Sequence, residues 1–480
     1  MECLNLLHMD MDQHWISSTL NLQSTQQQQQ QQQQQATTIS METSLLDHQF
    51  LNNNKEEDEQ DLQRQLPCEI VEEILLQLPV KSLLRFRCVC KPWLALISDP
   101  KFIKSHLHNH STKQDEGDDD GKTRSSKALV MLSSSLSILK SVHVQVLDTR
   151  IEAGSTEADA AGAARTTSTR VVVVEEVHES PMRHQAVQDM KIVGSCNGLL
   201  CLVLDSQDMM IYNPSTRQLQ PVPPPPPPPP PTNNYYSGKD YFYGFGYDSS
   251  NDDYKIVRAS CSSRNGNFAT HLDMYNLNTN SWRAAIKTLP CYFLSNVVGT
   301  LLNGALHWVV RLAAAERPFS IVSFDVTEET YRYVPLPGEG DKNFSFYGLG
   351  VLGGCLSMLY SPHGSDYEVW LMNEYGVKAS WTIFTTIPQK MESEYLGLMS
   401  LVRILNNGEI VILLHQRKLV IYNPGHRTLR TILSGDIHSS QLALYLETLV
   451  SPSAAPTIKT YSSSITPLLN QAKAKAKASP

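Results

Sequence analysis

Five similar phrases recur in the second part of the chain, about 50 residues apart except for a longer first interval. Each phrase is a short apolar run, a polar turn at Asn or Asp, and a second run that often ends in proline. The phrases begin at Ile211, Met274, Ser323, Leu371 and Ile421. Because Asn and Asp favour tight turns, each phrase predicts one antiparallel hairpin. A hairpin repeated at this period indicates a repeat architecture.

Other strands are predicted between the phrases, and most of them follow a glycine-containing turn. The strands are Leu199–Leu204, Lys255–Ala259, Ala305–Val310, Leu356–Tyr360 and Glu409–Leu414, and the turns are Asn197-Gly198, Asn303-Gly304, Gly353-Gly354 and Asn407-Gly408. About four strands per repeat at a period near 50 is typical of a kelch-like β-propeller blade. Strand-like runs at 127–147 and 171–177 can complete another blade. We therefore expect a mainly antiparallel propeller of six blades, with seven as the alternative.

Low-complexity segments lie at both ends of the chain and interrupt the repeats. We expect disorder in residues 1–61, which contain ten consecutive glutamines (26–35), and in residues 451–480. An acidic linker is predicted at 111–126, and insertions are predicted at 153–169 and 223–234. The last insertion contains Pro223–Pro231, which cannot join a sheet and is interpreted as a polyproline II spacer, with recognition by a proline-binding domain as the alternative.

A helical stretch precedes the repeats and runs from Leu66 to about His106. Ile70, Ile74, Leu75 and Leu78 recur at three and four positions, which places them on one face of a helix that Pro79 ends. Two further short helices are expected before a turn at Asp99-Pro100. Three such short helices present more apolar side chains than they can bury, so they need a partner surface or a neighbouring domain.

The run LPCEIVEEILLQLPVKSLLRFRCVCKPW, which begins at Leu66, resembles an F-box, and specifically that of the plant F-box-associated family. GSCNGLLCL at 194–202, IYNPSTRQ at 211–218, YGFGYDSSNDDYKIVR at 243–258 and LNGALHWV at 302–309 resemble phrases of the same family. The resemblance implies an α+β multidomain chain. In it, a small helical F-box at 62–110 precedes an F-box-associated β-propeller at 127–450.

The resemblance also implies a partner, because an F-box docks on a Skp-type adaptor and thereby joins a cullin–RING ubiquitin ligase. Carried over by position, the adaptor-facing residues are Leu66, Pro67, Ile70, Ile74, Leu78, Pro79, Leu83, Val89 and Trp93. The implied function is that of the substrate-receptor subunit of an SCF-type ligase, whose propeller captures a target protein. One alternative is an interaction scaffold that pairs with an adaptor without assembling a ligase. Another is a propeller enzyme of the kelch-type oxidase kind, which would need converging metal ligands.

No pattern in the sequence predicts catalysis, a cofactor or a metal site. His106, His108 and His110 alternate, and we interpret them as a flexible edge. Burial as small apolar residues is expected for Cys88 and Cys90, and a sheet-core position for Cys196 and Cys201. Gly244 and Gly246 form a short G-x-G without the helix and lysine of a nucleotide loop. Trp282, Trp308, Trp370 and Trp381 are expected to pack inside blades.

Composition limits the remaining classes of function. The net charge of −8 without a basic cluster argues against nucleic-acid binding. Nine cysteines without a regular spacing, in a chain without a secretory signal at its start, indicate reduced thiols. The apolar window at 296–315 contains Asn303, His307 and Arg311 and is not interpreted as a membrane span. We expect a soluble intracellular protein, in the nucleus or the cytoplasm.

Overall fold

The computed structural model describes the helical stretch and most strands of the repeats. The described residues are 67–112, 128–133, 138–149, 168–178, 190–204, 208–227, 241–264, 267–284, 289–293, 298–312, 319–338, 344–362, 366–391, 394–395, 399–405, 407–415, 418–434 and 441–453. The chain divides into two compact units, Met1–Glu72 and Glu73–Pro480. The predicted tail at 1–61 and most of the other low-complexity segments lie outside the described residues.

Four helices follow Pro67, where three were predicted. They are α2 (Cys68–Leu76), α3 (Val80–Phe86), α4 (Lys91–Ser98) and α5 (Pro100–Thr112). The fourth helix arises because Asp99 acts as an N-cap: its Oδ1 accepts the backbone N–H of Lys101 at 2.7 Å. Pro100 occupies the first helical position, where its missing N–H costs nothing. Asp99-Pro100 therefore starts a helix, and the interpretation as a simple turn was wrong.

The helical stretch has a small core of its own. Its buried apolar residues are Leu75, Val80, Leu83, Ile97 and Phe102. His106 on α5 is also buried, and its Nε2 lies 2.9 Å from the carbonyl oxygen of Leu78. The expected flexible edge at His106, His108 and His110 is thus part of helix α5, which contacts α4 and, through His106, Leu78 just after α2.

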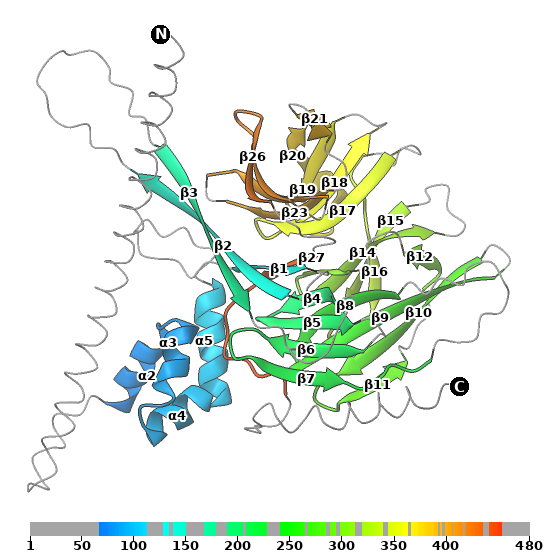
Figure 1. The fold of residues 1–480 in the computed structure, drawn as a ribbon. Helices are drawn as coiled ribbons and strands as arrows, with labels where there is room; N and C mark the ends of the chain where they lie inside the picture. The colour runs from blue at the N-terminus through cyan, green and yellow to red at the C-terminus, as the bar shows by residue number, and fades with distance from the viewer. Residues whose placement is uncertain are drawn as a thin grey trace, which may run out of the picture. The chain divides into compact units, whose positions relative to one another are not determined.

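The repeats form antiparallel sheets, shown in Figure 1. Among the described strands, five sheets have four strands and one has five, so six sheets of blade size are present. A two-stranded ribbon, β21 (Lys390–Met391) with β22 (Glu394–Tyr395), is separate from them. The predicted class, a short helical domain followed by an antiparallel propeller, is confirmed.

The sheets follow one another along the chain. The first contains β1 (Ala128–Ser133), β2 (Ile138–Thr149), β3 (Ser168–His178) and β27 (Gln441–Tyr445). The second contains β4 (Met190–Cys196), β5 (Leu199–Leu204), β6 (Met209–Asn213) and β7 (Gln218–Val222). The third contains β8 (Tyr241–Asp248), β9 (Asp253–Arg264), β10 (Asn267–Asn276) and β11 (Ser281–Ala284).

The last three sheets repeat this plan. The five-stranded sheet contains β12 (Cys291–Phe293), β13 (Thr300–Leu302), β14 (Ala305–Leu312), β15 (Phe319–Asp325) and β16 (Tyr331–Val334). The next contains β17 (Phe344–Leu352), β18 (Cys355–Pro362), β19 (Tyr367–Met372) and β20 (Trp381–Ile387). The last contains β23 (Met399–Ile404), β24 (Ile410–Leu414), β25 (Lys418–Asn423) and β26 (Thr428–Ser434).

The recurring phrases are the outer hairpins of five sheets, as predicted. They form the antiparallel pairs β6–β7, β10–β11, β15–β16, β19–β20 and β25–β26. In four of these turns the residue four positions after the Asn or Asp has a positive φ. These residues are Arg217, Asn280, Glu329 and Arg427. The shared left-handed position shows that the phrases are equivalent turns.

The first sheet joins the two ends of the propeller sequence. Strand β27, near the end of the described chain, pairs with β1 in antiparallel register, with Leu444 opposite Leu129. β27 also contacts β4 of the second sheet and β23 of the last sheet. The ring of sheets is therefore closed by strands from both ends of the repeat region.

The core lies between neighbouring sheets. One buried cluster joins Val193 and Leu199 of the second sheet to Phe245 and Ile256 of the third. Gly244 shows how close the packing is, because a Cβ placed there would lie 2.6 Å from the Leu306 side chain of the next sheet. The short G-x-G is therefore a packing feature of β8.

Candidate functional site

The helical stretch leaves several large apolar side chains exposed to solvent. Ile70 and Ile74, one turn apart on α2, are 41% and 49% exposed. Val89, after α3, is 55% exposed, and Leu94 on α4 is also exposed. The helices therefore have a core but do not cover all their apolar side chains. Such residues are candidates for contact with another protein.

The predicted adaptor-facing residues divide into three groups. Pro67, Ile70, Ile74, Pro79 and Val89 are exposed, and Leu78 and Trp93 are half-buried. The Trp93 ring packs on Phe86 with its centroid 5.4 Å away. Leu83 has no exposed surface, so the structure places it in the core and corrects its assignment to the contact surface. Leu66 lies outside the described residues.

The burial of the cysteines differs from the prediction in the helical stretch and agrees with it in the sheets. Cys88 and Cys90 are exposed, so the expectation of buried thiols was wrong there. They follow the end of α3, and Cys90 is the N-cap residue of α4, where the chain lies outside the helical core. Cys196 and Cys201 are buried in the second sheet, and burial raises the pKa of the Cys196 thiol to about 12.

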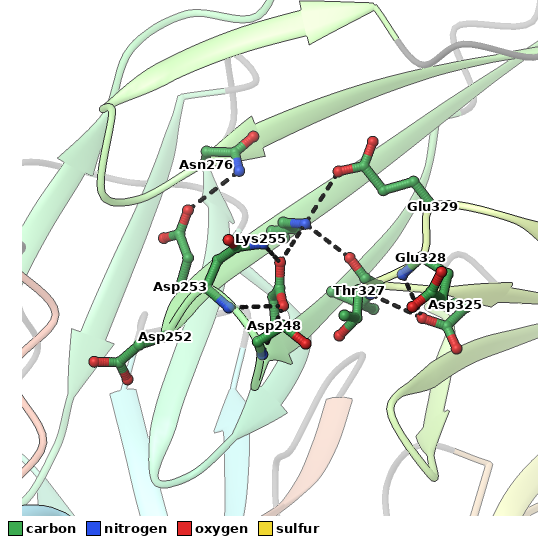
Figure 2. A network of polar contacts seen from close by, with 12 residues as sticks. Asp248, Asp252, Asp253, Lys255, Asn276, Asp325, Thr327, Glu328 and Glu329 are labelled. Carbon is green, nitrogen blue, oxygen red and sulfur yellow. Dashed lines mark hydrogen bonds and ion pairs between the residues drawn. The ribbon is translucent and has the colours of Figure 1, made fainter.

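A buried polar network joins the third sheet to the five-stranded sheet (Figure 2). Lys255 on β9 is its centre, and its side chain is 3% exposed. Its Nζ lies 2.7 Å from Oδ2 of Asp248 and 3.0 Å from Oε1 of Glu329. It also donates a hydrogen bond to the carbonyl oxygen of Val326 at 2.9 Å. Arg283 on β11 forms a further ion pair with Glu329.

The network keeps its carboxylates ionised. Burial alone would raise the pKa of Asp248, but hydrogen bonds from Asn251 and Lys255 and the charge of Lys255 lower it well below its ordinary value. Burial alone would likewise raise the pKa of Glu329. The hydrogen bonds and charges of Arg283 and Lys255 outweigh this effect and lower the pKa below its ordinary value. Every charged group in the network therefore has an opposite charge beside it. These ion pairs link the third sheet to the five-stranded sheet.

Several other polar residues in Figure 2 shape turns. Oδ1 of Asp325 accepts the backbone N–H groups of Thr327 at 2.9 Å and of Glu328 at 2.8 Å. Asn213 makes the equivalent contact with Ser215 at 2.8 Å. Asn423 accepts the N–H of His426 at 2.9 Å in the same way, so in three of the phrases the Asn or Asp supplies the turn.

A second charged residue, Arg258 on β9, is 1% exposed and lies under the first prolines after β7. Its Nη2 is 2.6 Å from Oδ2 of Asp273 and donates to the carbonyl oxygen of Pro226 at 2.6 Å. Nε1 of Trp282 donates to the carbonyl oxygen of Pro223 at 2.7 Å. This contact is not predictable from the sequence, because the pattern indicates blade packing for Trp282 and a spacer for Pro223.

The part of the chain that the structure describes holds no candidate metal site and no membrane-spanning helix. Within those ranges, no group of three or more His, Cys, Asp or Glu side chains is arranged to hold a metal ion. No helix there has the length and apolar character needed to cross a membrane.

Comparison with known protein families shows which family this combination of helices and propeller belongs to. Residues 163–451 match the F-box associated beta propeller domain, and residues 64–105 match the F-box domain. The chain belongs to the F-box-associated β-propeller family. The F-box match covers the helices α2, α3 and α4 and the first part of α5, and the propeller match covers the strands from β3 to β27.

Curated relatives from Arabidopsis thaliana resemble this F-box protein over most of its length. F-box protein CPR1 is 30% identical over 400 residues, which cover 79% of this chain and 86% of the relative. An F-box/kelch-repeat protein is 29% identical over 398 residues, covering 81% and 96%. F-box/WD-40 repeat-containing protein 1 is 26% identical over 329 residues, covering 66% and 67%. The similarity thus spans both the F-box and the propeller.

Proposed function

We propose that this F-box protein is a substrate-receptor subunit of an SCF-type, cullin–RING ubiquitin ligase. In this role the F-box docks on a Skp-type adaptor, and the propeller binds a target protein. Ubiquitin transfer belongs to other subunits, so this chain contributes proximity and orientation and no catalytic residue. The role requires an intracellular chain.

The exposed pair Ile70 and Ile74 is the observation that carries the proposal. Both side chains belong to the F-box match, lie one turn apart on α2 and keep 41% and 49% of their surface exposed in the isolated chain. Docking would remove apolar surface from water, which is the main source of affinity in a contact of this kind. The other proposed contact residues are the exposed Pro67, Pro79 and Val89 and the half-buried Leu78 and Trp93.

Co-purification of the full chain with a Skp-type adaptor tests the proposal. We expect Ile74→Asp to reduce the adaptor recovered by about tenfold or more, because it places a charge in an apolar contact. The matched control is Ile383→Asp on β20 of the propeller, since Ile383 is 48% exposed, almost the same as Ile74. Equal adaptor recovery with the native chain and the Ile74 variant would remove the basis of the proposed contact.

The same purification separates the ligase from the scaffold alternative. Recovery of a cullin together with the adaptor supports a ligase subunit. A stable complex with the adaptor that lacks the cullin would favour an interaction scaffold instead.

A further inference from the structure

The chain's own proline segment lies against side chains of the third sheet, which together are called the groove below. Pro223–Pro227 follows β7 directly, and the residues beneath it come from all four strands of the next sheet. These residues are Tyr241 on β8, Arg258 on β9, Asp273 on β10 and Trp282 on β11. The groove is therefore built by the sheet as a unit.

The two donors of the groove match the repeat of a polyproline II helix. Trp282 binds the carbonyl oxygen of Pro223, and Arg258 binds that of Pro226. These two carbonyls are three residues apart, which is one turn of a polyproline II helix of about 9 Å. The exposure of the segment has the same period, since Pro224 and Pro227 are exposed and Pro223 and Pro226 are half-buried.

The groove is held in shape by contacts that do not involve the prolines. Asp273 fixes the Arg258 guanidinium through Nε at 3.1 Å and Nη2 at 2.6 Å. The guanidinium also lies over two aromatic rings, 4.9 Å from the centroid of Tyr241 and 5.7 Å from that of Trp282. A buried arginine that is held by an acidic partner and two rings is already ordered before a ligand binds. Binding therefore costs less side-chain entropy.

The chemistry of the groove suits proline in particular. Its polar contacts to the segment are donors, and a proline backbone offers carbonyl acceptors but has no N–H that would need a partner. Aromatic side chains beside fixed donors are the usual means by which proteins recognise proline-rich segments.

We propose that the groove formed by Tyr241, Arg258 and Trp282 is a binding site for proline-rich segments in the polyproline II conformation. The chain's own Pro223–Pro227 fills it at rest, and a proline-rich segment of another protein takes the site by exchange. Because the internal segment is tethered beside the groove, it competes at a high effective concentration. The inference concerns the propeller and does not rest on the adaptor contact, so either can fail without the other.

The test uses the full chain and a fluorescein-labelled oligoproline peptide, with binding followed by fluorescence anisotropy. Replacement of residues 223–231 by a Gly-Ser sequence of the same length removes the whole proline run and empties the groove. We expect this variant to bind oligoproline at least about tenfold more tightly than the native chain does, since the tethered competitor is gone. A labelled Gly-Ser peptide should bind neither chain.

Two further substitutions assign the binding to the groove. Trp282→Phe, added to the emptied chain, should weaken oligoproline binding several-fold because it removes the N–H donor and keeps a ring. Trp370→Phe is the control, since the N–H of Trp370 donates instead to Glu368 on β19. Thermal unfolding of each variant shows that the propeller is still folded.

A milder variant keeps the test decisive if the full replacement does not fold. Pro224→Gly with Pro225→Gly leaves the carbonyls of Pro223 and Pro226 in place and loosens the backbone between them. This pair should raise the oligoproline affinity by a smaller factor. Equally weak oligoproline binding by the folded native chain and the folded variants would overturn the proposal.

Discussion

The side-chain amide of Asn213 donates a hydrogen bond of 3.1 Å to the carbonyl oxygen of Thr448, 235 residues further along the chain. The same Nδ2 donates to the carbonyl oxygen of Val450 at 2.6 Å, while Oδ1 accepts the N–H of Ser215 at 2.8 Å. Asn213 is fully buried. One amide thus closes the β6–β7 turn and also holds the segment that follows β27. It strengthens the closure of the propeller beyond the pairing of β27 with β1.

Asn213→Ala should therefore destabilise the propeller. The substitution leaves the carbonyl oxygens of Thr448 and Val450 without this donor and removes the acceptor of the turn, so we expect a loss of about 2–4 kcal/mol in the free energy of unfolding. Urea unfolding at neutral pH measures it. Asn278→Ala is the control, because Asn278 is exposed and should change stability by less than about 0.5 kcal/mol. A similar loss in both variants would show that Asn213 has no special part in the closure.

Lys255→Met tests the buried network between the third sheet and the five-stranded sheet. The variant leaves Asp248, which has no exposed surface, without its ion-pair partner. Removal of one member of a buried pair costs about 3–5 kcal/mol. Adding Asp248→Asn should recover part of this loss, because the unpaired charge is then gone. Lys378→Met, at an exposed position in the β19–β20 turn, is the control. An additive effect of the two network substitutions would contradict the pairing.

The same network predicts how stability depends on pH. The pKa of Asp248 in the folded chain lies below its ordinary value of 3.8. A carboxylate with a depressed pKa stabilises the folded state fully above that ordinary value, and the contribution is lost as the pH falls through the folded-state pKa. The stability difference between the native chain and Lys255→Met should therefore be largest near pH 7 and smaller near about pH 2.5. Urea unfolding at the two pH values measures it, and a constant difference would contradict the assignment.

The hairpins could be predicted from the sequence because their signals are local. In three phrases the Asn or Asp (Asn213, Asp325 and Asn423) accepts N–H groups two or three residues ahead, so a few residues specify the turn. Strand positions follow from these turns. The closing pair of β1 and β27 carries no such signal, because the paired strands are separated by most of the propeller.

The incorrect predictions concern residues whose local sequence pattern is compatible with more than one structure. Asp99-Pro100 fits a turn and equally an N-cap with proline in the first helical position, and the buried face of α5 decides for the helix. Leu83 fits an adaptor-facing position in the family pattern, but packing among the helices buries it. The groove at Arg258 was missed because its residues come from four strands and one connection.

Thiol labelling offers a direct check on the exposure of the F-box and the burial of the sheets. Cys68, Cys88 and Cys90 are exposed and should react with a thiol reagent within minutes in the native chain. Cys196 and Cys291 are buried, and burial raises the pKa of each thiol to about 12, so both should react only on unfolding. Mass spectrometry of the labelled peptides distinguishes them. Rapid labelling of Cys196 in the folded chain would contradict the sheet core.

Substitutions at Leu83 and Val89 distinguish the F-box core from the proposed contact surface. Leu83→Ala removes a fully buried side chain and should lower the free energy of unfolding of the F-box by about 2–5 kcal/mol. Val89→Asp changes an exposed side chain and should alter stability by less than about 0.5 kcal/mol.

The two variants should therefore affect adaptor binding for different reasons. Val89→Asp should weaken it about tenfold at every temperature at which the F-box is folded, because a charge enters the contact. Leu83→Ala should bind normally when cold and lose binding only as the helices unfold. Adaptor pull-down across a temperature series, with thermal unfolding followed in parallel, measures both. Normal binding by the folded Val89 variant would exclude Val89 from the contact, and weak binding by a folded Leu83 variant would return Leu83 to it.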